Sequence, residues 1–175
     1  MKKIGIVTDS HSSISQEEAE KLGIFVLPMP FYIDGECFYE SVTLSRELFF
    51  EKLAAGADIT TSQPSPTAVM EIWDKALEQF EKILYLPISS GLSGSYETAM
   101  MLAKDETYEG RVLVVDDGQV AAPLHQMVLD TLDMIKKGYE AEQIRDLLER
   151  AGDRMMIYIA LQTLECLKKG GRVTP

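Results

Sequence analysis

The second half of the sequence alternates short apolar runs with longer segments whose apolar residues recur at helical spacing. Lys82 to Ile88 and Arg111 to Val115 have the pattern of buried strands, and a helical pattern follows each of them. This alternation predicts an α/β fold with a mainly parallel sheet flanked by helices on both faces. In such sheets ligands bind beyond the carboxyl ends of the strands, so the residues that follow each strand are the functional candidates.

The first half contains a predicted strand, a capped helix and an interrupted apolar run. Lys3 to Thr8 has the pattern of a strand, and Ser15 stands where an N-cap of the next helix would lie. Pro28 and Pro30 fall inside the apolar run from Ile24 to Ile33, which predicts an edge strand or a broken one. The other expected elements are a hairpin turn at 34–35, a polar loop at 60–64, a strand at 155–161, and helices at about 45–55, 65–80, 120–137, 141–151 and 163–169.

The composition is that of an ordinary folded domain with an acidic surface. Hydrophobic residues make up 46%, charged residues 26%, and the net charge is -11. Such a surface repels phosphate backbones and anionic lipids, so we expect no nucleic-acid partner and no membrane insertion. With two cysteines and two histidines, we expect no disulfide framework, no metal site and no cofactor. We expect a cytoplasmic protein, because no apolar run is long enough for a signal-peptide core or a membrane span.

Three polar clusters lie at predicted strand ends: Thr8-Asp9-Ser10, Ser89 to Ser95, and Asp116-Asp117. The second is the strongest signal, because it joins a buried strand to a helix and contains two glycines. Glycines let the backbone approach a ligand closely, and a helix start offers unpaired N–H groups to a carboxylate or phosphate. Ser93 could donate a hydroxyl, and Gly94 or Ser95 a backbone N–H.

Other interpretations of these clusters remain open. The second cluster could be a strand-to-helix turn with a serine cap, and Gly91-Leu92-Ser93-Gly94 approaches the nucleophile turn of a serine acyl hydrolase. A hydrolase also needs a histidine, and neither His11 nor His125 is obviously placed to serve it. The cluster lacks the lysine of a phosphate-binding loop. Asp9 is expected to bind loop N–H groups more readily than to act as an acid or base.

Taken together, four stretches resemble the DegV family of bacterial fatty-acid-binding proteins. Each is weak alone, but their order and spacing are specific, and the resemblance extends over the whole chain. The stretches are Ile6 to Ser10 with Ser13, Thr60 to Pro66, Ser89 to Tyr96, and Leu167 to Pro175.

The resemblance implies a two-domain α/β protein that is not itself an enzyme. The implied function is to bind a long-chain fatty acid and to present it to the catalytic subunit of a fatty acid kinase, which would phosphorylate the bound carboxylate with ATP. By this resemblance, residues 1–169 would form the N-terminal domain, and residues 170–175 would begin the junction to a C-terminal domain that is missing from this chain.

The resemblance also assigns roles to individual residues. It implies that Thr61 and Ser93 contact the carboxylate. The segment Asp117 to Pro123 departs from the small Ser- or Thr-containing stretch usual in the family. Arg172 follows two glycines and is expected at the junction or partner surface, outside the carboxylate pocket. The full ligand-binding set that we expect is Thr61, Ser62, Ser93 and Gly94, supported by Asp9, Ser10, Ser90 and Gly91.

Overall fold

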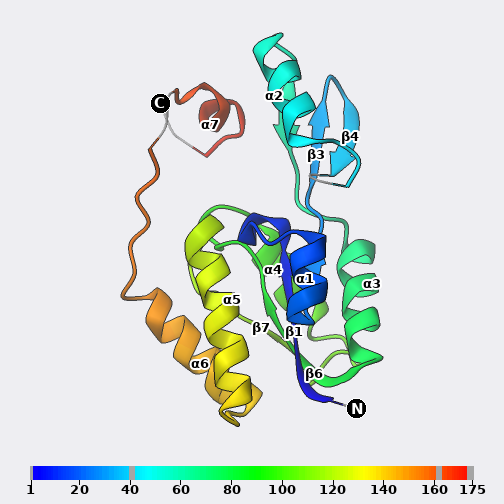
Figure 1. Ribbon diagram of the computed structural model, residues 1–175, viewed down its shortest axis with the longest axis vertical. Helices are drawn as coiled ribbons and strands as arrows, with labels where there is room; N and C mark the ends of the chain where they lie inside the picture. Colours follow the sequence, from blue (N-terminus) through cyan, green and yellow to red (C-terminus); the bar gives the residue numbers. More distant parts are fainter. Residues whose placement is uncertain (1, 40–41, 161–162, 173–175) are drawn as a thin grey trace. The chain divides into compact units, whose positions relative to one another are not determined.

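The computed structural model describes residues 2–39, 42–160 and 163–172, and the chain divides into two compact units (Figure 1). The first unit comprises Met1–Leu27 and Ser65–Ile157, and the second comprises Pro28–Pro64 and Tyr158–Pro175. The first unit contains a parallel sheet, and the second contains an antiparallel one.

A four-stranded parallel sheet forms the centre of the first unit. All three neighbouring strand pairs are parallel. In the central pair, Thr8 near the end of one strand lies opposite Leu86 at the end of the other. This confirms the parallel sheet predicted from the alternating pattern. In spatial order the strands are β2 (Phe25–Leu27), β1 (Lys2–Asp9), β6 (Phe80–Leu86) and β7 (Val112–Val114).

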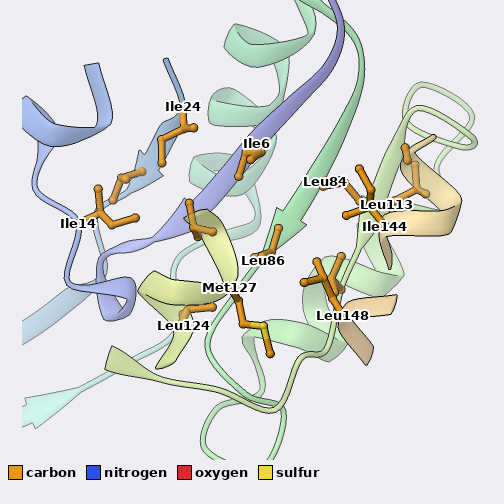
Figure 2. Packing of buried hydrophobic residues seen from close by; sticks show 14 of the residues in the cluster. Ile6, Ile14, Ile24, Leu84, Leu86, Leu113, Leu124, Met127, Ile144 and Leu148 are labelled. Carbon is orange, nitrogen blue, oxygen red and sulfur yellow. The ribbon is translucent and has the colours of Figure 1, made fainter. Parts of the chain in front are cut away.

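Helices cover both faces of this sheet, because neighbouring strand residues point to opposite sides. Ile6 packs in one hydrophobic cluster and Val7 in the other, as the period-two geometry of a strand requires. The first cluster packs the sheet against α1 (Gln16–Leu22), α5 (Ala121–Lys136) and α6 (Ala141–Gly152). Figure 2 shows Leu84, Leu124 and Ile144 in this layer.

The opposite face packs against α3 (Pro66–Leu77) and α4 (Ser95–Leu102). Its centre is aromatic: the Trp73 ring lies edge-on to Tyr85 at 5.5 Å and to Tyr108 at 5.3 Å between centroids. Aromatic pairs favour this edge-to-face arrangement. All three rings are buried, and α3 packs its buried residues Val69, Trp73, Ala76 and Leu77 in this cluster.

Local capping chemistry fixes where several helices begin. The Ser15 hydroxyl accepts a hydrogen bond from the Glu18 N–H, and the Ser65 hydroxyl accepts one from the Ala68 N–H. Pro66 occupies the first turn of α3, where its missing N–H costs nothing. The cap at Ser15 was predicted from the sequence and is confirmed.

The second unit holds a three-stranded antiparallel sheet. A turn with positive φ at Asp34 and Gly35 joins its first two strands, as the hairpin signal predicted. In spatial order the strands are β4 (Glu36–Tyr39), β3 (Pro30–Ile33) and β5 (Ile59–Thr61), and the unit also contains α2 (Arg46–Ala54) and α7 (Glu165–Lys169). The apolar run interrupted by prolines is therefore a broken strand whose halves, β2 and β3, belong to different sheets.

Two local predictions were wrong. Thr60 and Thr61 were expected in a loop, but they pair with Tyr32 and Phe31 in β5. A strand was expected at 155–161; residues 155–160 form none, and residue 161 lies outside the described part of the chain. A strand needs a pairing partner, and Tyr158 is instead 88% exposed.

Candidate functional site

The loop that links β6 to α4 lies at the carboxyl edge of the parallel sheet, where ligands bind in such folds. We call residues 88–94 the ligand loop. Its backbone folds into a turn, because the Leu92 and Ser93 N–H groups both donate to the Ser89 carbonyl, at 3.0 and 3.2 Å. The prediction that Ser93 lies at the strand-to-helix junction is confirmed.

The Ser93 hydroxyl forms a pair with Ser95 at the start of α4. The two Oγ atoms are 2.6 Å apart, and the Ser95 N–H donates to Ser93 Oγ at 3.3 Å. Ser95 is buried, whereas Ser93 is half-buried and Gly94 is exposed. If the Ser95 hydroxyl donates to Ser93, the Ser93 proton is left to donate to an anion. The serine therefore caps the turn locally and can also bind a ligand.

Asp9 connects the end of β1 to the start of the ligand loop. Its carboxylate is fully buried: Oδ2 accepts from the Ile88 N–H at 2.8 Å and Oδ1 accepts from the His11 N–H at 2.9 Å. The prediction that Asp9 binds loop N–H groups is therefore confirmed. Ser10 opens a short 3-10 helix, Ser10–Ser12, directly after it.

The segment Asp116 to Gln119 follows β7 and contacts the same loop. Asp116 Oδ1 accepts from the Ser90 N–H at 3.3 Å, and the Gln119 carbonyl accepts from the Ser89 N–H at 2.9 Å. Asp117 is fully buried. Burial raises the pKa of the Asp117 carboxyl to about 7, and the nearby carboxylates of Asp116 and Asp9 act in the same direction.

The polar cluster at Asp116-Asp117 could be predicted from the sequence, but the role of this segment in holding the ligand loop could not. The contact from Gln119 runs through a backbone carbonyl, which no side-chain pattern reveals. The available signal was the string of polar residues after a buried strand, since such residues must find partners when they are buried.

The other predicted site residues lie in the second unit. Thr61 is the last residue of β5 and is exposed. The hydroxyl of Ser62, also exposed, donates to the Gln63 carbonyl at 2.8 Å. Arg172 is exposed and follows Gly171, whose φ is positive. The structure tests neither the joint action of Thr61 with Ser93 nor the partner role of Arg172, and both stay predictions.

Within the described residues, no cluster of three or more His, Cys, Asp or Glu side chains is arranged to hold a metal ion. No helix in the same part of the chain is both long and apolar enough to cross a membrane.

A parallel sheet between two helical layers, with a glycine- and serine-rich loop at its carboxyl edge, defines an α/β domain of the open-sheet type. The family model described as "Uncharacterised protein, DegV family" matches residues 3–175, so the chain belongs to the DegV family.

Known proteins of this family agree in sequence and in fold. A DegV domain-containing protein of Deinococcus radiodurans is 34% identical over 97% of this chain and 60% of its own length. The structure described as fatty acid binding of a DegV family protein from Thermus thermophilus is 32% identical, with a TM-score of 0.83 over 97% of this chain and 60% of that one. A Thermotoga maritima structure, described as revealing fatty acid binding function, is 25% identical over 86% of this chain and 55% of that one, with a TM-score of 0.74.

The chain spans about three fifths of the length of the curated relatives that it matches, 62% and 60% for two of them. The fatty-acid ligand and the kinase partner are therefore proposals for this chain.

Proposed function

We propose that this chain binds a long-chain fatty acid, performs no chemistry on it, and presents it to the catalytic subunit of a fatty acid kinase. Membership of the DegV family and the similarity to the fatty-acid-binding protein of Thermus thermophilus support the ligand class. The observation that carries the proposal is the Ser93 hydroxyl, held by Ser95 at the carboxyl edge of the parallel sheet.

The carboxylate of the fatty acid is the group that this loop can bind. The Ser93 hydroxyl and the backbone N–H at Gly94 would donate to it, at the start of α4, where the helix offers positive partial charge. Thr61 and Ser62 would supply further hydroxyls, as the resemblance implies. Residues 89–95 contain no Lys or Arg, so the headgroup is held by hydrogen bonds with no cationic side chain from this loop.

The acyl chain would contribute most of the affinity. Burying a methylene gains about 0.8 kcal/mol, so a chain of about 15 methylenes gains roughly 12 kcal/mol before the cost of association. Each hydrogen bond to the charged carboxylate contributes about 1.5–3 kcal/mol. Binding alone needs no general base, which fits a carrier.

The alternative, a serine acyl hydrolase, needs a histidine that activates Ser93. Both histidines of the sequence instead face carboxylates. His11 Nδ1 is 3.2 Å from Asp9 Oδ1, and His125 Nε2 is 3.3 Å from Glu18 Oε1. The Ser93 hydroxyl pairs with Ser95, so these pairings favour the carrier.

The kinase partner follows from the family resemblance. Such a kinase consumes ATP, so the proposal places the protein in the cytoplasm. Arg172, exposed after α7, is the residue that we propose for the partner surface.

Mass spectrometry of the purified protein under native and denaturing conditions tests the ligand class. A carrier would release an intact fatty acid on denaturation, at no more than one per chain. A hydrolase would show either no ligand or an acyl group still attached to Ser93 after denaturation. The covalent adduct would overturn the proposal.

A further inference from the structure

Three successive N–H groups at the start of the ligand loop each donate to a different acceptor. Ile88 donates to the Asp9 carboxylate, Ser89 to the Gln119 carbonyl, and Ser90 to the Asp116 carboxylate. Two of these three acceptors belong to residues 116–119, which we call the brace segment. The position of the ligand loop therefore depends on the position of the brace segment.

The brace segment contains two buried acceptor atoms with no hydrogen-bond partner, Asp117 Oδ2 and Gln119 Oε1. The two residues are otherwise joined: Asp117 Oδ1 accepts from the Gln119 N–H, and Gln119 Nε2 donates to the Asp117 carbonyl, both at 2.9 Å. An ionised Asp117 can only accept, whereas a protonated one can donate. A proton on Oδ2 would thus make this buried atom a donor and would remove an uncompensated negative charge from the brace segment.

The charged groups around Asp117 are mainly acidic. Asp9 at the end of β1 and Asp116 in the brace segment both disfavour a negative charge on Asp117. From α6, the Glu149 carboxylate accepts from the backbone of Asp116, and Arg145 of the same helix interacts with Glu149.

The aromatic and imidazole groups near these carboxylates come from three other elements. Burial and the Asp9 carboxylate raise the pKa of Tyr85 on β6. Burial and the carboxylates of Glu149 and Asp116 raise the pKa of Tyr96 on α4. Nδ1 of His11 lies 3.2 Å from Asp9 Oδ1. Burial raises the pKa of the Asp117 carboxyl to about 7, with Asp116 and Asp9 adding to the effect, while the hydrogen bond from Gln119 opposes it.

We propose that Asp117 is a positioning residue of the ligand loop: its protonated form holds the brace segment and the loop in the ligand-binding arrangement, and loss of the proton loosens both. The movement of the loop does not depend on the ligand, whereas the consequence for fatty-acid binding rests on the function proposed above. The carboxylate of a bound fatty acid would add a further negative charge at the same sheet edge, which an ionised Asp117 disfavours.

Asp117→Asn is the informative variant, because asparagine keeps the acceptor for Gln119, can donate where the carboxyl proton would, and does not ionise. Asp130→Asn on the exposed side of α5 is the matched control. The first readout is amide hydrogen exchange of Ser89 and Ser90 without ligand, as protection factors between about pH 5.5 and about pH 8.5. We expect wild-type protection to fall by roughly three- to tenfold around pH 7, to stay constant in Asp117→Asn, and to fall in Asp130→Asn as in wild type.

The second readout is palmitate affinity, expressed as the ratio of Asp117→Asn to wild type at each pH, which cancels the titration of palmitate itself. The ratio should be near one at low pH and should rise severalfold above about pH 7. If neither protein binds palmitate, the proposed function fails, and the exchange data still decide the role of Asp117. In wild type alone, the carbon-13 shift of the Asp117 carboxyl should titrate together with the protection of Ser89, which needs no variant. Protection of Ser89 that is independent of pH, or equally dependent in Asp117→Asn, overturns the proposal.

Discussion

Oδ2 of Asp9 accepts a 2.8 Å hydrogen bond from the backbone N–H of Ile88, although the two residues are 79 positions apart in the sequence. The contact joins the ends of the two central strands of the parallel sheet and fixes where the ligand loop starts. The other oxygen of the same carboxylate accepts from the His11 N–H. One buried carboxylate therefore accepts hydrogen bonds from two loops, and it needs both of its oxygens to do so.

Asp9→Asn should therefore destabilise the protein. An amide has one acceptor oxygen, so either the Ile88 or the His11 N–H would face an NH2 group in a fully buried place. We expect a loss of about 1–3 kcal/mol in the free energy of unfolding, measured by urea denaturation.

Asp116→Asn is the matched control for this change. A single oxygen of Asp116 accepts from both Ser90 and Gly118, and asparagine retains such an oxygen. The loss should stay below about 1 kcal/mol. Equal losses in Asp9→Asn and Asp116→Asn would contradict the different roles assigned to the two carboxylates.

Gly152→Ala should destabilise the protein although alanine normally favours a helix over glycine by about 1 kcal/mol. A Cβ at Gly152, the last residue of α6, would lie 2.2 Å from the backbone carbonyl oxygen of Asp117. The brace segment would have to move, at a cost of about 1–3 kcal/mol. Thermal unfolding should give a lower midpoint than for Gly91→Ala, where the nearest atom is 3.6 Å away. A thermal unfolding midpoint of Gly152→Ala at or above that of wild type would show that the brace segment can move without a loss of stability.

The stability of the protein should carry a pH dependence from Asp117. Burial raises the pKa of this carboxyl from 3.8 to about 7 in the folded state, so unfolding releases its proton between those values. The contribution of Asp117 to stability therefore falls as pH rises from about 4 to about 7 and is constant above, by at most about 1.4 kcal/mol per pKa unit. Other carboxyl groups titrate too, so the difference between wild type and Asp117→Asn is the measured quantity. The variant should gain stability relative to wild type as pH rises; a difference that does not change with pH would mean that Asp117 is ionised throughout.

Arg172→Ala should weaken production of acyl phosphate by the kinase and leave palmitate binding intact. The guanidinium is exposed after α7, as expected for a group that meets a partner. Arg154→Ala, another exposed arginine, is the control and should leave the rate unchanged. The measurement is the initial rate at saturating palmitate. A rate for Arg172→Ala equal to that of the control would remove Arg172 from the partner surface.

The parts of the fold that could be predicted from the sequence are those that local chemistry determines. Ser15 and Ser65 cap helices because their hydroxyls lie three residues from the N–H groups they bind. Ser93 was placed correctly because an apolar strand, a glycine-rich turn and a helical stripe follow one another without interruption.

What could not be predicted depends on residues far apart in the sequence. Thr61 was expected in a loop because its own neighbours are polar, yet it pairs with Phe31, 30 positions earlier. Residues 155–160 have an apolar strand pattern but form no strand, because the pattern says nothing of a partner. The hydrogen bond from Ser89 to Gln119 joins two backbones and leaves no trace in residue types.

The central claim is that Ser93 and Thr61 together hold a fatty-acid carboxylate. Calorimetry with palmitate on wild type, Ser93→Ala, Thr61→Val and the double variant tests it most directly. Each single change should cost about 1–3 kcal/mol, because the carboxylate loses a hydrogen bond, and the double variant should cost less than the sum, because both residues act on one group. Affinities within about twofold of wild type in all three variants, a difference below about 0.5 kcal/mol, would show that the headgroup binds elsewhere.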